Sequence, residues 1–250
     1  MASQLQAQFR ETVEKAIGIE NALKNGSPRL FGIYEKIRRI EELPAKEECK
    51  LLMNSVDSSF GASSYTSLMV KNGYYQIVHK ELISDLKKLV NRLDPKSSVE
   101  PCAGVGKLSY HLNESGIDIT ATDSGKIVKS DHAIQLTHLQ TLRIFNPELV
   151  IVAFPPDSSV VFDSLRHESV KWVLVLRKGR QILELNKKEV KQSSVRTEAV
   201  EIDIYPSAVD SLDNHQKING KPMVDIDPNK EERIRNFYLN VLFYSKRAEN

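Results

Sequence analysis

The sequence lacks several features that mark specialised protein classes. It has only two cysteines, Cys49 and Cys102, and neither forms a Cys-x-x-Cys pair, which excludes a disulfide framework and argues against a metal centre. No segment approaches the ~18 uninterrupted apolar residues of a membrane span. The N-terminal residues 1–5 contain no apolar core of the kind that a signal peptide needs. We therefore expect a cytoplasmic protein with no membrane association and no bound metal.

The sequence also lacks an excess of charge of either sign. Its 35 Lys and Arg residues against 33 Asp and Glu residues leave a formal charge of +2, so bulk charge does not support nucleic-acid or anionic-membrane binding. Hydrophobic residues at 40% and charged residues at 27% are typical of a soluble globular protein and exclude long disorder or coiled coil as the main architecture. At 250 residues the chain predicts one large domain, or one domain with an extension.

The first part of the chain has the apolar spacing of amphipathic helices. One stripe runs from Leu5 to Leu23, and a second from Phe31 to Leu43 is closed by Pro44. A shorter helical pattern around Leu51 leads into residues 55–64, which are rich in Ser and Gly. The apolar spacing therefore predicts that residues 1–72 form a helical N-terminal extension. Its apolar stripes pack within the chain, pair with a second copy or a protein partner, or form a cap over a substrate.

From residue 73 onward the pattern predicts an α/β domain that extends to residue 250. An amphipathic run at residues 81–90 is followed by short apolar runs separated by helix-length spacers. Strands that alternate with helices indicate a doubly wound, mostly parallel sheet with helices on both faces. The last two runs are expected to form an antiparallel pair. The apolar runs lie around Val99 and at residues 117–122, 149–154, 172–176, 199–205 and 237–244.

The most informative segment is the glycine-containing turn in residues 98–108, Ser-Val-Glu-Pro-Cys-Ala-Gly-Val-Gly-Lys-Leu. A P-loop is excluded because Pro101 occupies the first glycine position and Leu108 replaces the magnesium-binding hydroxyl. A dinucleotide fingerprint is disfavoured because Ser109 stands where its third glycine is required. The segment instead fits Glu-x-x-x-Gly-x-Gly, in which a strand that carries an acid runs into a turn of small residues and then into a helix.

A second acid lies at the end of the next predicted strand. Asp123 follows Glu100 by 23 positions, at the end of the run Ile-Asp-Ile-Thr-Ala-Thr-Asp. A carboxylate there can accept two hydrogen bonds from a ribose diol, while the turn offers N–H groups to the rest of a ligand. Glu100, the turn and Asp123 are therefore predicted to form one site.

This segment resembles motif I and the following acidic motif of class I S-adenosylmethionine-dependent methyltransferases. The resemblance implies a seven-stranded sheet, with S-adenosyl-L-methionine as cofactor. It also implies that the turn and its acid hold the methionine portion and that Asp123 holds the ribose. Cys102 stands where the family most often has its first glycine, so the backbone there must tolerate a small side chain. The cofactor-binding candidates in this segment are Glu100, Cys102, Ala103, Gly104, Gly106 and Asp123.

A second motif follows the fourth predicted strand, at Phe154-Pro155-Pro156-Asp157. Two prolines fix φ and remove N–H groups, so they hold the strand-end carbonyls rigidly. The position is that of motif IV, where the family presents its methyl acceptor. The polar and aromatic ends of the pattern found in base amino-methyltransferases are both replaced here. By resemblance, Phe154 and Pro155 border the cofactor and Pro156 borders the substrate.

Other candidates lie near this predicted site. Asp157 is the candidate base or orienting group, with a helix N-cap as the alternative role. Tyr74 and Tyr75 are candidate substrate-binding residues, with core packing as the alternative. The Gly73-Tyr74-Tyr75 segment also resembles the aromatic residues that precede the first core helix in a poorly characterised group of methyltransferase-like proteins. His138 lies near the adenine end of the site or has a structural role.

Three hypotheses on function follow from these motifs. The first is a methyltransferase that acts on a small molecule or a protein, by in-line transfer from the sulfonium. The second is a non-catalytic protein on the same fold that retains the ligand or uses its helices as an interaction surface. The third is a nucleic-acid methyltransferase, for which the basic run at residues 177–180 is the supporting feature and the near-zero net charge is the opposing one.

Overall fold

The computed structural model describes residues 2–61, 64–74, 78–125, 129–153, 159–178, 200–203 and 239–245. The chain begins with four helices, α1 (Ala2–Gly26), α2 (Pro28–Arg38), α3 (Lys46–Phe60) and α4 (Ser64–Lys71). The break between α1 and α2 has a local cause. Ser27 is the N-cap of α2, its side chain accepts the N–H of Leu30, and Pro28 occupies the first helical position, where its missing N–H costs nothing.

Two helix boundaries in this part differ from the sequence-based prediction. Helix α2 ends at Arg38 rather than continuing to Leu43, because Arg39 adopts an extended backbone. Helix α3 continues through the Ser-rich residues 55–60, and α4 lies within the predicted helical residues 1–72, although no apolar spacing marked it as a separate helix. Tertiary packing overrides the weak local propensity of these serines, since Val56 on α3 and Leu68 on α4 are fully buried.

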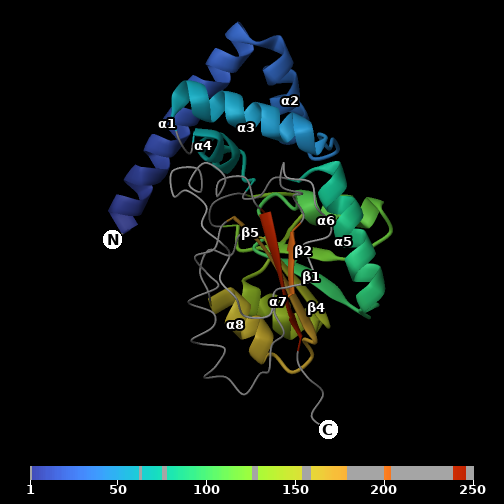
Figure 1. Ribbon diagram of the computed structural model, residues 1–250. Coiled ribbons are helices and arrows are strands. Elements are labelled where there is room, and N and C mark those ends of the chain that lie inside the picture. Colours follow the sequence, from blue (N-terminus) through green and yellow to red (C-terminus); the bar gives the residue numbers. More distant parts are fainter. Residues whose placement is uncertain are drawn as a thin grey trace, which may run out of the picture.

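The four helices share a hydrophobic core that lies at one end of the molecule, above the sheet in Figure 1. Tyr74 still packs into this helical core, whereas Val78 belongs to the core on the sheet. Val105, from the glycine turn, packs against the helical core as well. The buried members contributed by the helices are Ala16, Ile19, Leu23, Ile33, Tyr34, Ile37, Cys49, Leu52, Met53, Val56, Tyr65, Leu68 and Met69.

The rest of the described chain is built on one sheet. Within the described residues the sheet has seven strands in the order β3-β2-β1-β4-β5-β7-β6. The first five strands in that order run parallel, and β7 pairs antiparallel with both β5 and β6. The strands are β1 (Ser98–Pro101), β2 (Thr120–Asp123), β3 (Ile134–Gln135), β4 (Leu149–Ala153), β5 (Trp172–Lys178), β6 (Val200–Asp203) and β7 (Leu239–Ser245).

The predicted α/β class with a mostly parallel sheet is confirmed, and so is the antiparallel pairing of the last two runs. Among the described residues the parallel part of the sheet contains five strands. Strand β3 was missed because it has only two residues, both of them exposed, and so carries no apolar pattern.

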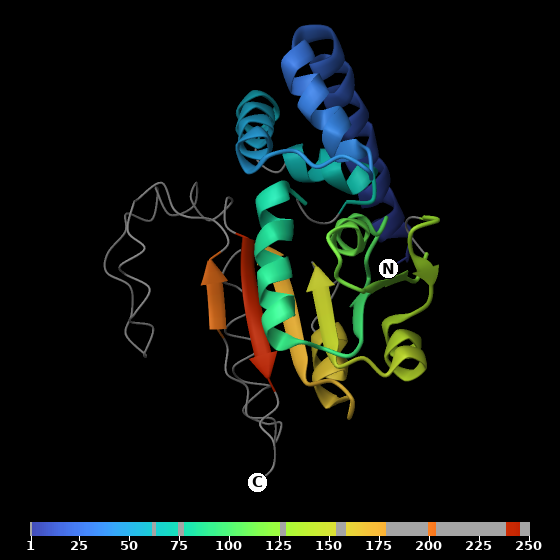
Figure 2. The same cartoon turned by 90° about the vertical axis from the view of Figure 1, so that its right-hand side faces the viewer.

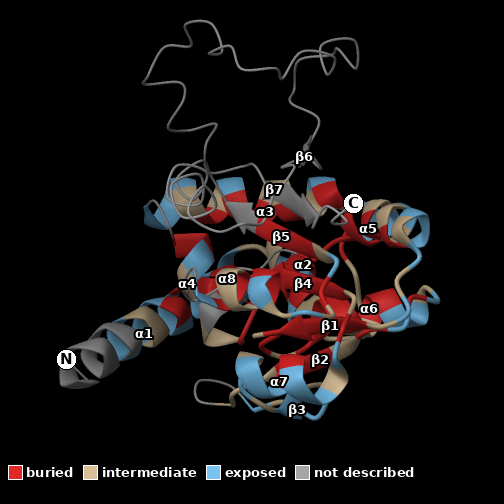
Figure 3. Cartoon of the chain, turned by 90° about the horizontal axis from the view of Figure 1, so that it is seen from below, coloured by how far each residue is buried: buried red, intermediate tan, exposed pale blue. Residues whose placement is uncertain are grey.

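Helices cover both faces of the sheet. Helices α5 (Lys80–Leu93) and α6 (Lys107–Glu114) pack on one face, where α5 crosses in front of the strands in Figure 2. Helices α7 (His138–Phe145) and α8 (Ser159–Arg166) pack on the other. Alternate residues of β4 point to the two cores, so this central strand is buried on both sides, as the colours of Figure 3 show.

The strand order reverses at a defined point of the sheet. Strand β1 lies between β2 and β4, and the chain proceeds outward from it first in one direction and then in the other. The carboxyl ends of β1 and β4 therefore border the topological switch point, where open α/β sheets bind their ligands.

None of the helices that the structure describes is both long enough and apolar enough to cross a membrane.

Candidate ligand-binding site

The turn after β1 folds back through a series of left-handed residues. Cys102, Gly104 and Gly106 have φ values of 59°, 59° and 80°. The N–H of Ala103 donates to the carbonyl of Thr122 at 2.9 Å, which fixes the turn against β2. Gly106 is then the N-cap of α6. The four N–H groups of residues 103–106 donate to acceptors of the protein itself, so their donation to a ligand stays a prediction.

Asp123 is held against the same turn. Its Oδ2 accepts the N–H of Gly104 at 3.0 Å, and its Oδ1 accepts the N–H of Gly125 at 2.9 Å. A carboxylate has about four lone-pair directions, so these two bonds orient the side chain without exhausting its capacity as an acceptor. The predicted association of Asp123 with the glycine turn is therefore present in the structure.

Glu100 lies on the inner side of the turn and is fully buried. Its Oε2 accepts two hydrogen bonds from one residue, from the backbone N–H of Ser109 at 3.1 Å and from its hydroxyl at 2.6 Å. In the sequence, Ser109 marks only the place where a dinucleotide fingerprint would have its third glycine. Its position in the first turn of α6 is the signal for its role, because that turn faces the end of the preceding strand.

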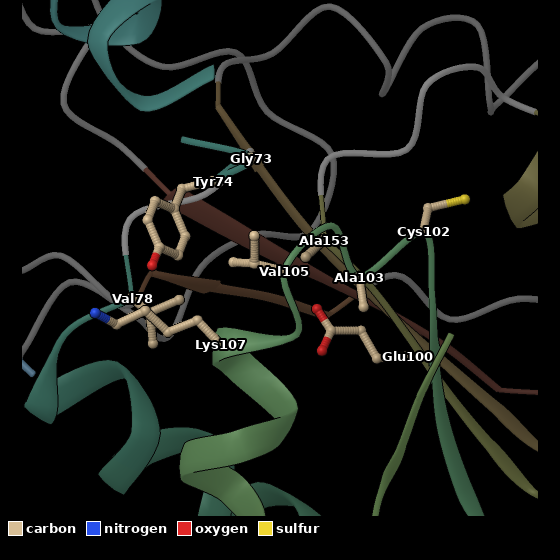
Figure 4. A pocket seen from close by; sticks show the side chains of 9 residues that line it. All are labelled: Gly73, Tyr74, Val78, Glu100, Cys102, Ala103, Val105, Lys107 and Ala153. Atoms are coloured by element: carbon tan, nitrogen blue, oxygen red, sulfur yellow. The ribbon is translucent and has the colours of Figure 1, made fainter. Parts of the chain in front are cut away.

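A pocket opens beside this carboxylate at the switch point. It contains about 240 Å³ of empty space, part of it open to solvent. Ala153 contributes the end of β4, and residues from β1, the turn and the helical part contribute the other walls (Figure 4). The lining residues are Gly73, Tyr74, Val78, Glu100, Cys102, Ala103, Val105, Lys107 and Ala153.

The structure brings most of the described candidates together. Glu100, Cys102, Ala103 and Tyr74 line the pocket, while Gly104 bonds to Asp123 across the turn. The sulfur of Cys102 points away from Tyr74 (Figure 4). The predicted residues Tyr75, Phe154, Pro155, Pro156 and Asp157 lie outside the described residues, so their proposed roles stay predictions.

Gly106 has a packing role that the sequence did not show. A Cβ at this position would lie 2.8 Å from the backbone oxygen of His132, a distance that requires a shift of the backbone. Only glycine therefore combines this φ with this close approach. The structure thus assigns Gly106 to the support of the turn.

Lys107 and His138 have structural partners. Lys107 would be the phosphate-binding lysine of a P-loop, but its ammonium group donates to backbone carbonyls at the end of α2. His138, the first residue of α7, lies with its Nε2 2.8 Å from Oδ2 of Asp163 on α8. This contact supports the structural role considered for His138.

Comparison with known proteins gives remote structural likeness only. No protein-family model matches the chain, and no curated protein matches it by sequence. A SAM-dependent O-methyltransferase from Thermotoga maritima superposes with a TM-score of 0.43 at 12% identity, covering 70% of this chain and 68% of the other. The plantazolicin methyltransferase BpumL in complex with SAH superposes with a TM-score of 0.37 at 10% identity, covering 98% of this chain and 100% of the other. Likeness at this level carries no argument for function.

The left-handed backbone at Cys102 leads to a prediction on stability. A side chain at φ 59° is strained by about 1–2 kcal/mol relative to glycine, which adopts this region freely. We expect Cys102→Gly to be more stable than Cys102→Ala by about 1 kcal/mol in urea unfolding, because both variants remove the thiol and only glycine relieves the strain. Equal stability of the two variants would show that the surrounding turn imposes no strain there.

Proposed function

We propose that this chain binds S-adenosyl-L-methionine at the glycine turn and transfers its methyl group to a small molecule or a protein. The observation that carries the proposal is the pair of carboxylates at the ends of β1 and β2. Glu100 is buried beside a pocket at the switch point, and Asp123 is bonded to the amide of Gly104 on the other side of the turn. The class I methyltransferase motifs resembled by this segment use acids at these two places.

The two acids suit the two ends of the proposed ligand. A buried carboxylate such as Glu100 favours a positively charged group, because an opposite charge offsets the cost of removing it from water. The ammonium group of the methionine portion has that charge. The pocket borders Glu100, so the proposal places the methionine end of the ligand there. Asp123 then accepts hydrogen bonds from the ribose diol.

When bound, the cofactor supplies a methyl group that is already activated by its sulfonium. The protein then has to align the acceptor with that methyl group and, where the acceptor carries a proton, remove it. We assign the proton-accepting or orienting role to Asp157 and the walls of the acceptor site to Tyr74, Tyr75 and Pro156. Phe154 and Pro155 follow directly after Ala153 in the sequence, and Ala153 lines the pocket.

The test is direct binding of S-adenosylhomocysteine, measured by calorimetry and by thermal unfolding. At about 100 times the Kd, the ligand should add about 2.7 kcal/mol to the free energy of unfolding. Asp123→Ala should weaken binding at least tenfold, because the ribose loses its acceptor. Asp118→Ala is the matched control, since Asp118 is an exposed acid that precedes the same strand. Absence of binding to the wild-type protein would overturn the proposal.

Methyl transfer needs a separate test once binding is established. The protein is incubated with S-adenosylmethionine labelled in its methyl group and with fractionated pools of metabolites and proteins. We expect label in a small-molecule or protein fraction and none in RNA or DNA. Binding without transfer to any pool would leave a ligand-binding protein without catalysis.

A further inference from the structure

The C-terminal end of α2 is capped by residues from a distant part of the chain. The last four carbonyls of an α-helix have no partner within the helix. Here the ammonium group of Lys107 donates to three of them, the carbonyls of Lys36 at 3.0 Å, Ile37 at 2.8 Å and Arg39 at 2.6 Å. The hydroxyl of Tyr74 donates to the fourth, the carbonyl of Arg38. Two side chains therefore satisfy the complete end of the helix.

These contacts offset part, but not all, of the cost of burying the charge of Lys107. All three N–H donors of the ammonium group are used, and its charge lies at the negative end of the α2 dipole. The same ammonium group lies 5.4 Å from the centre of the Tyr74 ring, within the range of a cation–π contact. Lys107 is only 3% exposed, so these contacts act with little screening by water.

The two capping residues also border the candidate ligand pocket. Tyr74 and Lys107 both line it, from opposite sides of the junction between the helical part and the sheet (Figure 4). Gly73, the neighbour of Tyr74, accepts a hydrogen bond from the N–H of Val105 in the glycine turn. One connected set of contacts thus runs from the turn through Tyr74 and Lys107 to the end of α2.

We infer that Lys107 is a positioning residue through which occupation of the pocket tightens the docking of α2 and its neighbouring helices onto the sheet. This inference rests on the proposed function, because it takes S-adenosylhomocysteine as the occupant. A ligand that restrains the turn and Tyr74 also restrains the groups that cap α2. Linkage requires the reverse effect as well, so docking of α2 strengthens ligand binding by the same factor.

Protonation gives the coupling a defined pH dependence. Burial lowers the pKa of Lys107 to about 8, so the docked state binds fewer protons than an undocked state in which the lysine is exposed. Docking therefore strengthens as the pH rises from about 8 towards 10.5. The groups that face Lys107 are Cys49 on α3, Glu41 and Glu42 after α2, His111 on α6 and the Tyr74 ring. Burial raises the pKa of Cys49 and of Tyr74 to about 12, so both stay neutral below pH 10.

The experiment is hydrogen exchange of the amides in the last turn of α2, measured with and without saturating S-adenosylhomocysteine. In the wild-type protein we expect the ligand to slow this exchange about tenfold, within the usual range of coupling between sites. Lys107→Met should lose this ligand-dependent slowing. It should still bind the ligand, but with lower affinity than the wild-type protein. Between pH 8 and pH 9.5, exchange corrected for its intrinsic rate should slow in the wild type and stay constant in Lys107→Met.

Lys87→Met is the matched control. Lys87 also caps a helix end, through a 2.6 Å bond from its ammonium group to the carbonyl of Ser115, and it lies on α5 away from the pocket. This variant should retain both effects. Tyr74→Phe removes one capping hydroxyl and keeps the ring, so it carries the test if Lys107→Met does not fold; it should show a reduced ligand effect.

The outcomes separate this inference from the proposed function. If calorimetry shows binding but exchange at α2 does not change, the coupling is wrong and the ligand site stands. The same conclusion follows if Lys107→Met, or Tyr74→Phe in its place, keeps the full ligand effect. If calorimetry shows no binding to the wild-type protein, the proposed function fails and the coupling fails with it.

Discussion

Glu100→Gln is expected to change stability and ligand affinity in opposite directions. The free energy of unfolding should rise by about 1–2 kcal/mol, because glutamine brings no charge into this fully buried position and can keep the two hydrogen bonds from Ser109. The amide oxygen of glutamine can still accept the N–H and the hydroxyl of Ser109. Affinity for S-adenosylhomocysteine should fall about 100-fold, or about 2.7 kcal/mol, because the ligand's ammonium group loses its opposite charge and meets an NH₂ donor.

This combination distinguishes a binding residue from a structural one. If the carboxylate of Glu100 stabilises the fold, Glu100→Gln should have a lower free energy of unfolding than the wild type. If the carboxylate serves to bind a ligand, it destabilises the ligand-free protein, and Glu100→Gln should have a higher free energy of unfolding. Urea unfolding without ligand gives the first quantity, and calorimetry gives the second. Loss of stability in Glu100→Gln together with unchanged affinity would contradict the proposed role.

Glu148→Gln supplies the matched control for that variant. Glu148 lies at the opposite, amino-terminal edge of the sheet, where it accepts the N–H of Lys96 at 3.1 Å and pairs with Lys171 at 2.7 Å. The bond to Lys171 lowers the pKa of this carboxyl, so its charge is favourable in the folded state. We expect Glu148→Gln to be slightly less stable than wild type and to bind S-adenosylhomocysteine normally.

The parts of the site that the sequence predicted are those whose signals are local in the chain. Glu100 and the glycine turn lie within a few residues of each other, and Asp123 marks the end of the very next strand. Parallel strands place their carboxyl ends at one edge of the sheet, so this spacing is sufficient to bring the two acids around one turn. The α/β alternation that supports them is likewise a repeated local pattern.

The parts that the sequence did not predict depend on contacts between distant residues. The end of α2 is set by Lys107, which lies 68 to 71 positions away from the carbonyls that it caps. A Gly-Lys pair after a strand is most easily interpreted as a phosphate-binding element, and nothing near Lys107 in the sequence indicates a helix end as its partner. The role of Gly106 also depends on a distant residue, because His132 approaches it only in the folded chain.

Gly106→Ala is expected to lower the free energy of unfolding by about 3 kcal/mol. Two penalties add at this position. The φ of 80° costs a residue with a Cβ about 1–2 kcal/mol, and the new Cβ would lie 2.8 Å from the backbone oxygen of His132, which is rigid compared with a side chain. Because the backbone must shift to relieve that contact, the turn should be displaced and the affinity for S-adenosylhomocysteine should fall as well.

Gly116→Ala separates the two penalties. Gly116 has a φ of 90° at the other end of α6, and a Cβ there would have no neighbour within 4 Å. This variant should lose about 1–2 kcal/mol from backbone strain alone and should retain its ligand affinity. The difference between the two variants in urea unfolding then measures the contact with His132. If Gly106→Ala were no less stable than Gly116→Ala, the close approach would not constrain the turn, and the requirement for glycine at residue 106 would come from its φ alone.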